Sequence, residues 1–84
     1  MDTVTIKIKF FGSIASGIGL SELLAPVRRE KEKGLEDVGR IVREKAGDQV
    51  LYTILINGYS HYLSKKTELY PEDEISIVPI VLGG

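Results

Sequence analysis

The chain of 84 residues has room for one domain with a single core, and its 43% hydrophobic and 27% charged residues are ordinary for a globular protein. Its 11 basic and 12 acidic residues give a net charge of −1, which leaves no electrostatic footprint for nucleic acid, and no apolar run approaches the roughly 18 residues of a membrane span. The lack of cysteine and the single histidine, His61, exclude disulfides, thiolate nucleophiles, and thiolate or His-rich metal sites.

The N-terminal segment predicts a strand. Residues 1–5 contain no basic region followed by an apolar one, so we expect no secretion signal and a cytoplasmic protein. Residues 3–10 alternate without a break, which is typical of a strand with one buried face. That face comprises Val4, Ile6, Ile8 and Phe10. Phe11 falls on the opposite, polar side, and the glycine-punctuated residues 12–19 predict a loop.

Residues 20–34 allow two interpretations. Leucines and a valine match helical spacing around residues 20–27, but Pro26 interrupts that pattern. We favour a short edge strand around Leu23–Arg28, where a proline is tolerated. The mixed charges of residues 28–33 indicate a solvated turn, and a binding patch is the alternative.

The next segment predicts the main helix. Its apolar positions step by three, four and four residues, at Leu35, Val38, Val42 and Ala46. Glu36 and Arg40 are spaced for an ion pair. We expect Gly34 just before the helix, Gly47 as its C-terminal cap, and Gly39 inside it at a cost of about 1 kcal/mol relative to alanine.

A hairpin follows the helix. Residues 50–56 form a strongly apolar strand. Asn57–Gly58 is the dipeptide favoured in turns where both central residues have positive φ. Residues 59–63 are expected to return as a short strand.

The last third of the chain predicts a crossover and a final strand. Residues 64–70 cross over with Leu69 as an anchor, and residues 71–73 form a turn. Residues 74–78 form the last strand, which ends where Pro79 lacks a ladder donor. One helix against a mixed sheet of four or five strands is an α+β roll with a two-layer core.

No enzyme site emerges from the residues. No Ser/His/Asp or Cys/His set and no phosphate-binding GxxxxGK[ST] loop is present. The carboxylates at 72–74 admit an acid/base pair or a hard-metal site, but a solvated turn is the favoured interpretation. His61 is predicted to be a surface residue. The tyrosines are predicted to be core and rim aromatics: Tyr52, Tyr59, Tyr62 and Tyr70.

The sequence ends in an apolar run followed by two glycines, Ile80-Val81-Leu82-Gly83-Gly84. A frayed end or a cloning remnant explains a glycine pair but not the apolar run before it. Glycines carry no Cβ, so such a backbone can enter a narrow active site and approach a nucleotide closely. A carboxylate built in this way suits activation by a partner enzyme: adenylation provides AMP as the leaving group, sulfide from a partner's persulfide then gives a thiocarboxylate, and no thiol of this chain competes.

The runs Leu55–Gly58 and Glu68–Gly84 resemble the C-terminal half of MoaD-like and ThiS-like sulfur carriers, and Ile6–Phe11 resembles their first strand. The resemblance implies a ubiquitin-like β-grasp domain over residues 1–79 and a flexible tail over residues 80–84. It also implies a MoaD-type small subunit of molybdopterin synthase, a carrier with no activity of its own that supplies sulfur for molybdopterin. The implied partners are a ubiquitin-activating-type adenylating enzyme, which uses ATP, and the large synthase subunit or another sulfur acceptor. No bound cofactor is implied.

Three departures from that family pattern bear on the pathway. After the first strand, this chain has Ala15-Ser16-Gly17 where the family usually has an Arg-Glu-Leu-like segment. Leu82 stands before the two glycines, where the family commonly has a small residue, and Ile80 follows Pro79, where the family often has a second proline. A ThiS-type or tRNA-thiolation carrier would use the same tail. In a different class, a ubiquitin-like modifier would join Gly84 to a lysine of another protein, and a third class is an interaction module that merely ends in two glycines.

Strand parity predicts where partners dock. Phe11 and Val78 fall on the outward sides of the first and last strands, which are paired neighbours in β-grasp proteins. Two exposed apolar groups beside a functional tail indicate an interaction patch. The predicted partner-binding residues are Phe11, Val78, Ile80, Val81 and Leu82, and activation is predicted to require Gly83 and Gly84.

Overall fold

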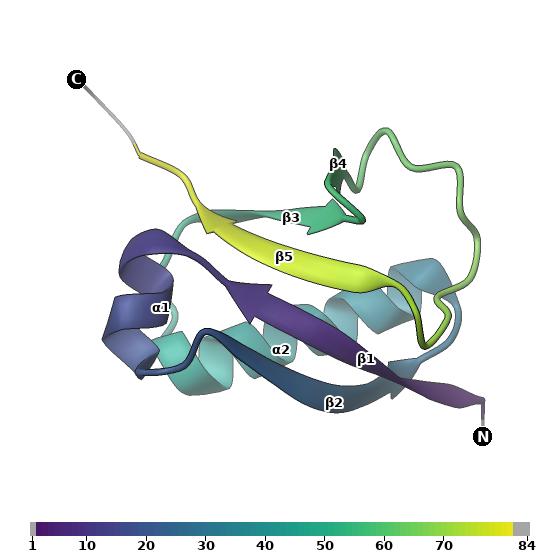
Figure 1. The fold of residues 1–84 in the computed structure, drawn as a ribbon, viewed down its shortest axis with the longest axis horizontal. Helices are drawn as coiled ribbons and strands as arrows, with labels where there is room; N and C mark the ends of the chain where they lie inside the picture. The colour runs from purple at the N-terminus through teal and green to yellow at the C-terminus, as the bar shows by residue number, and fades with distance from the viewer. Residues whose placement is uncertain (1, 82–84) are drawn as a thin grey trace.

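The computed structural model describes residues 2–81 and contains a mixed five-stranded sheet with one long helix across one face (Figure 1). The elements are β1 (Thr3–Phe10), α1 (Gly12–Ile18), β2 (Glu22–Arg28), α2 (Lys31–Ala46), β3 (Tyr52–Ile56), β4 (Tyr59–Ser60) and β5 (Glu74–Pro79). The sheet order is β2-β1-β5-β3-β4, with β1 and β5 parallel at the centre and the other neighbours antiparallel. The predicted α+β roll is confirmed.

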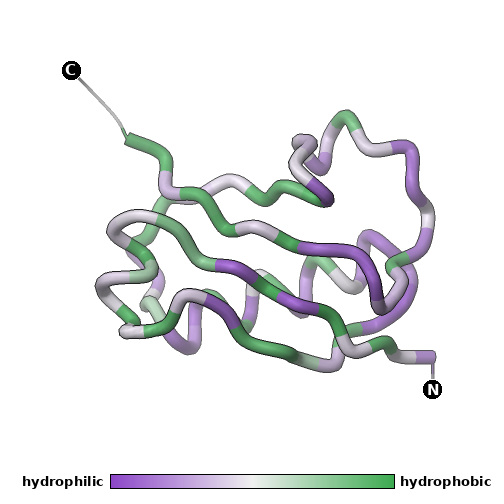
Figure 2. The backbone as a smooth tube through the Cα atoms, viewed as in Figure 1, coloured by the Kyte–Doolittle hydropathy of each residue, from purple (hydrophilic) through white to green (hydrophobic). Residues whose placement is uncertain are grey.

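The core forms between α2 and the inward face of the sheet. Figure 2 shows the alternation of apolar and polar residues along β1 that the sequence predicts. The register sets Ile8 opposite Ile75 and Phe10 opposite Ile77, and these four side chains are at most 3% exposed. The helix contributes the buried residues Leu35, Val38 and Val42. Burial of one face therefore explains the two-residue period of β1.

β2 lies at an edge of the sheet, as predicted. Phe10 N–H donates to Ser21 O at 2.9 Å and Arg29 N–H donates to Asp2 O at 3.0 Å, which defines the ladder between β1 and β2. Odd-numbered residues of β2 therefore bond to β1, and even-numbered residues turn their backbone groups outward. Pro26 is one of the outward residues, so its missing N–H removes no ladder bond.

Residues 12–18, predicted as a loop, form the helix α1, so that prediction is wrong. Apolar residues at helical spacing explain the helix: Phe11, Ile14, Ala15 and Ile18. Ile14 joins the core at 4% exposure. The left-handed Gly19 ends the helix, and its N–H donates to Ala15 O at 2.9 Å. Of the glycines that suggested a loop, Gly12 begins the helix, Gly17 lies inside it and Gly19 caps it.

The start of α2 also differs from the prediction. The helix begins at Lys31, so Gly34, expected to precede it, lies inside it and is buried. Residues 28–33 are not a solvated turn, because Arg28 ends β2 and residues 31–33 are helical. A Cβ on Gly34 would lie 2.5 Å from Arg28 O and 2.6 Å from Leu69 Cδ1, so the glycine permits a close approach of helix and strand.

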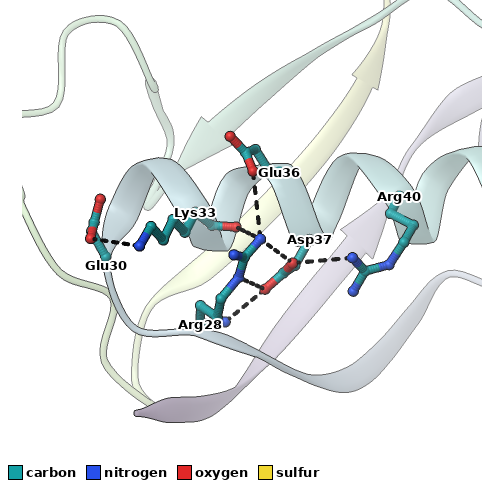
Figure 3. A network of polar contacts seen from close by, with 6 residues as sticks. All are labelled: Arg28, Glu30, Lys33, Glu36, Asp37 and Arg40. Atoms are coloured by element: carbon teal, nitrogen blue, oxygen red, sulfur yellow. Dashed lines mark hydrogen bonds and ion pairs between the residues drawn. The ribbon is translucent and has the colours of Figure 1, made fainter. Parts of the chain in front are cut away.

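A network of polar contacts joins the end of β2 to α2 (Figure 3). Asp37 Oδ2 accepts the backbone N–H of Arg28 at 2.9 Å, and Oδ1 accepts Arg28 Nη2 at 2.9 Å. Arg40 contacts Asp37 at 3.4 Å, whereas Glu36 pairs with Arg28 at 3.5 Å, so the predicted Glu36–Arg40 pair is wrong. The hydrogen bond from Arg28 lowers the pKa of the Asp37 carboxyl below its ordinary value, against the opposing effect of burial.

The substitution Asp37→Asn is expected to lower the free energy of unfolding by about 2 kcal/mol at neutral pH, because charge-assisted hydrogen bonds to a buried group are lost. The folded pKa of Asp37 lies below the unfolded value of about 3.9, so the carboxylate stabilises the fold above that value and stops doing so as the pH falls through the folded pKa. Urea titrations of both proteins should show a difference that shrinks toward acid. A difference that stays constant down to about pH 2 would contradict this linkage.

The hairpin after α2 agrees with the prediction in its turn but not in its length. Asn57 and Gly58 have φ values of 52° and 87°, which confirms the turn. The return strand, predicted over residues 59–63, ends at Ser60. Ser60 O accepts the N–H of Leu63 at 2.9 Å, so the chain turns back on itself and the ladder stops.

Three further predictions are confirmed. Gly47 caps α2, with its N–H donating to Arg43 O at 2.9 Å. Leu69 is fully buried and anchors the crossover. The last strand runs over Glu74–Pro79, one residue beyond the predicted end.

Candidate functional site

The candidate site lies where the chain leaves the sheet at the end of β5. Ile80 N–H donates to Leu51 O at 3.1 Å, so pairing beside β3 extends one residue past Pro79. The nitrogen of Pro79 faces the other side, where β1 has given way to α1, and its missing N–H removes no ladder bond there. Val81 is 86% exposed. The remaining tail residues lie outside the described part of the chain: Leu82, Gly83 and Gly84.

An apolar surface surrounds this point. Phe11 N–H donates to Ile77 O at 3.2 Å, which sets Phe11 beside Val78 on the sheet face opposite α2. Phe11 is 44% exposed and Val78 is half-buried, so their predicted outward placement is confirmed. Leu51 and Ile80 are also exposed. We call these four residues the exit patch: Phe11, Leu51, Val78 and Ile80.

A groove of about 420 Å³ borders the exit patch. Apolar residues of α1, the end of α2 and the following loop line it, among them Ile14, Ile18, Ala46 and Val50. Gly12 places α1 against the tail base, because its φ is +56° and a Cβ there would lie 3.1 Å from Pro79 Cγ. Sequence reasoning missed Leu51 and α1 as parts of this region. The spacing of Phe11, Ile14, Ala15 and Ile18 was the available signal for α1.

The charged side chains on the outer sheet face near the exit patch are paired. Lys9 Nζ lies 3.3 Å from Glu74 Oε1, and Lys7 Nζ lies 3.8 Å from Glu22 Oε2. Both ion pairs are partly exposed, so they contribute little stability. They match the charges of Lys7 and Lys9 on this face, and the exit patch itself presents mainly apolar surface to a partner.

The acidic cluster before β5 is structural rather than catalytic. Asp73, only 3% exposed, accepts hydrogen bonds from Asn57 Nδ2 and Tyr70 N–H, each at 2.8 Å, and lies 3.3 Å from Lys66 Nζ. Burial raises the pKa of Asp73, but the bonds from Asn57, Tyr70 and Lys66 outweigh burial and leave the pKa lowered. The predicted solvated turn is thus wrong for Asp73, which locks this turn to the Asn57 hairpin.

The other polar and aromatic candidates form no site. His61 is half-buried, with its ring centroid 4.0 Å from that of Tyr62. Tyr52 packs on the core, whereas Tyr59 and Tyr62 are strongly exposed. Within residues 2–81, no three His, Asp or Glu side chains gather as metal ligands. No helix in this part of the chain is long and apolar enough to cross a membrane.

No protein-family model and no curated protein matches the chain. Solved structures do match it, three of them as follows. Small archaeal modifier protein 1 (SAMP1) from Methanosarcina acetivorans is 24% identical, with all of both chains covered and a TM-score of 0.68. The HVO 2177 protein from Haloferax volcanii is 22% identical, over 98% of this chain and 88% of that one, with a TM-score of 0.67. A chain in the complex of subunits 1 and 2 of molybdopterin-converting factor from Helicobacter pylori is 23% identical, over 96% of this chain and 100% of that one, with a TM-score of 0.60.

These likenesses and the sheet topology define the fold. The chain has the β-grasp fold, with the mixed sheet packed on one main helix. The fold implied by the resemblance to MoaD-like and ThiS-like proteins is confirmed. At these identities the likeness concerns the fold alone, and function is argued from the site.

Proposed function

We propose that this protein is a MoaD-type sulfur carrier, the small subunit of a molybdopterin synthase. One observation carries the proposal: a β-grasp sheet delivers its last strand through Pro79 to the exposed Val81, and the sequence then ends in two glycines. The chain from Helicobacter pylori with the same fold occurs in a complex of two subunits of molybdopterin-converting factor. That complex supports a large-subunit partner for this chain.

The proposed chemistry takes place on the carboxylate of Gly84, inside partner enzymes. A carboxylate oxygen attacks the α-phosphorus of ATP, and pyrophosphate leaves, which forms an acyl adenylate. The outer sulfur of a partner persulfide then attacks the acyl carbon, and AMP leaves with the bonding electron pair. A partner thiol reduces the resulting acyl disulfide, which gives the thiocarboxylate. No thiol of this chain competes in either step, because the sequence contains no cysteine.

The described residues supply position rather than catalysis. The exit patch offers an apolar docking surface around the tail base. The bond from Ile80 N–H to Leu51 O fixes the direction in which the chain leaves that surface. Docking of a rigid base converts the encounter between carboxylate and nucleotide into an effectively intramolecular step, which is the usual benefit of a positioning surface.

Conjugation to proteins is the second candidate function. The likeness to small archaeal modifier protein 1 favours it, since that protein is a modifier with the same fold. In this case a lysine amine, instead of a persulfide, attacks the activated Gly84 carbonyl and an isopeptide bond forms. A ThiS-type or tRNA-thiolation carrier would share all three steps to the thiocarboxylate and differ only in the acceptor.

The intact mass of protein purified from its native host tests the proposal. A thiocarboxylate replaces one oxygen by sulfur and adds about 16 Da. Species of higher mass joined through Gly84 would favour the modifier. Protein that is never modified at Gly84, even when its activating enzyme and ATP are supplied, would contradict both functions.

The substitutions Phe11→Ala and Val78→Ala are each expected to weaken binding of the activating enzyme by about 1 to 3 kcal/mol, because apolar anchors at the centre of an interface contribute most. Calorimetric titration measures the affinity. Both variants should lose less stability than Ile8→Ala, since Ile8 is fully buried. Tyr62→Ala is the control, because Tyr62 is 84% exposed and follows β4, which Figure 1 shows at the opposite end of β3 from the tail base. A Phe11/Val78 double variant that binds normally would remove the exit patch from the mechanism.

A further inference from the structure

The outer edge of β2 carries unpaired backbone groups. No strand lies beyond β2 in the part of the chain that the structure describes, and Figure 1 shows this strand along the rim of the sheet. The ladder with β1 turns the N–H groups of Glu22 and Leu24 outward, together with the carbonyls of Glu22, Leu24 and Pro26. At the far end of the strand, the outward N–H of Arg28 is already bound by Asp37 Oδ2. The open stretch is therefore Glu22–Pro26.

Apolar side chains accompany this open stretch. Leu24 is 69% exposed, and Leu20 is 40% exposed. A groove of about 480 Å³ runs between β2 and α2, and both strand and helix residues line it, including Leu23 and Ile41. Exposed edge strands with apolar side chains are templates for pairing, and natural proteins usually protect them with charges or proline. Here Pro26 withdraws one donor, but the outward backbone groups of Glu22 and Leu24 and the carbonyl of Pro26 remain able to pair.

We propose that β2 is a self-association edge, on which two copies pair antiparallel over Glu22–Pro26 about a two-fold axis at Leu24. Leu24 then exchanges both of its backbone hydrogen bonds with Leu24 of the second copy. Glu22 N–H donates to the carbonyl of Pro26 in the second copy, and the same bond occurs twice by symmetry. Only the carbonyls of Glu22 lack a donor, because they lie opposite Pro26. The open edge is thus nearly complementary to itself.

The charges of α2 favour a second copy over an unlike peptide as the occupant. Arg40, Glu44 and Lys45 line the groove, with Arg40 and Glu44 one helical turn apart. In a two-fold arrangement the two α2 helices are antiparallel, so Arg40 of one copy is directed toward Glu44 of the other, twice. A uniformly basic peptide would meet the like charges of Arg40 and Lys45, and a uniformly acidic peptide would meet the like charge of Glu44.

The arrangement leaves the proposed carrier chemistry untouched. The tail base lies at the end of the sheet where β2 begins, so a two-fold axis through Leu24 places the two tails at opposite ends of the dimer. Both exit patches face the same side of a continuous sheet, because the axis is perpendicular to it. The inference rests on the edge alone and does not depend on the function proposed for Gly84.

Sedimentation velocity over a concentration series, from about 10 µM to 1 mM, tests the proposal. The average mass should rise from the 9.3 kDa of one chain toward twice that value. Leu24→Lys should abolish the rise, since two lysines would face each other across the axis. Leu63→Lys is the matched control and should leave the rise in mass unchanged, because Leu63 is similarly exposed, at 75%, but lies on the turn after β4. Pro26→Ala should tighten association by roughly tenfold, because it restores two donors opposite the Glu22 carbonyls.

Each other result counts against the proposal. A mass of one chain at every concentration would show that the edge does not self-associate. A dimer that survives Leu24→Lys, or one that Leu63→Lys dissolves, would place the interface elsewhere. Association that is unchanged or weaker in Pro26→Ala would overturn the register about Leu24.

Discussion

Removal of Gly83 and Gly84 should reduce ATP–pyrophosphate exchange by the cognate activating enzyme to background. The expected loss is complete because the truncated chain ends at Leu82, and its carboxylate no longer reaches the nucleotide on an unhindered backbone. The free energy of unfolding should change by no more than a few tenths of a kcal/mol, since the chain is already 86% exposed at Val81. Undiminished exchange by the truncated protein would contradict the carrier function.

A variant that keeps the terminal carboxylate at the same position separates the effect of tail length from the effect of steric fit in the active site. Gly84→Val retains the terminal group but adds a branched side chain next to the reacting carbon. We expect the exchange rate to fall much further than the affinity for the activating enzyme, because the exit patch is intact. Affinity by calorimetry and exchange by radiolabelled pyrophosphate measure the two effects separately. A normal exchange rate would show that the glycines do not serve a narrow channel.

Replacement of Gly34 by alanine is expected to destabilise the fold by about 1 to 3 kcal/mol, although alanine is the better helix former. The added Cβ would meet Arg28 O at 2.5 Å, and a backbone oxygen at the end of a paired strand cannot yield as a side chain does. The helix must then move away from β2, which weakens the bonds between Asp37 and Arg28. Chemical denaturation measures the loss.

At Gly39, in the same helix, a substitution by alanine is expected to have the opposite effect on stability. A Cβ there would meet only the hydroxyl of Tyr52, at 3.4 Å, which is tight but falls on the end of a side chain. Gly39→Ala should therefore be neutral or stabilise the protein by up to about 1 kcal/mol through helix propensity. If both variants shifted stability in the same direction by the same amount, the close approach at Gly34 would not explain the result.

The strands were predictable because each carries its own signal. Burial of one face imposes the alternation of β1, and Asn57–Gly58 specifies a turn with positive φ at both positions. Pro26 indicated that β2 is an edge strand, because an outward-facing residue of an edge strand lacks no ladder bond when its N–H is missing. These are local rules, and they hold without knowledge of the partner segments.

The features that the sequence analysis did not predict depend on contacts between residues distant in the chain. Glycines at the ends of α1 and inside it concealed this helix, and Ile14 stabilises it only by joining a core made by other elements. Neither the burial of Gly34 against Leu69 nor that of Asp73 beside Asn57 has a local signature. For the site, parity placed Phe11 and Val78 correctly, but Leu51 joins the exit patch through its pairing with Ile80, which strand periodicity does not reveal.

The hydrogen bond between Ile80 and Leu51 fixes the point on the sheet from which the reach of the tail is measured. From the Ile80 nitrogen to the terminal carboxyl carbon the backbone of five residues, 80–84, intervenes, and an extended chain spans at most about 3.3 to 3.6 Å per residue. The carboxylate therefore reaches no further than about 18 Å from this hydrogen bond. Any enzyme that docks on the exit patch and acts on Gly84 must hold its reaction centre within that depth, so the tail length selects among partners by the depth of their active sites.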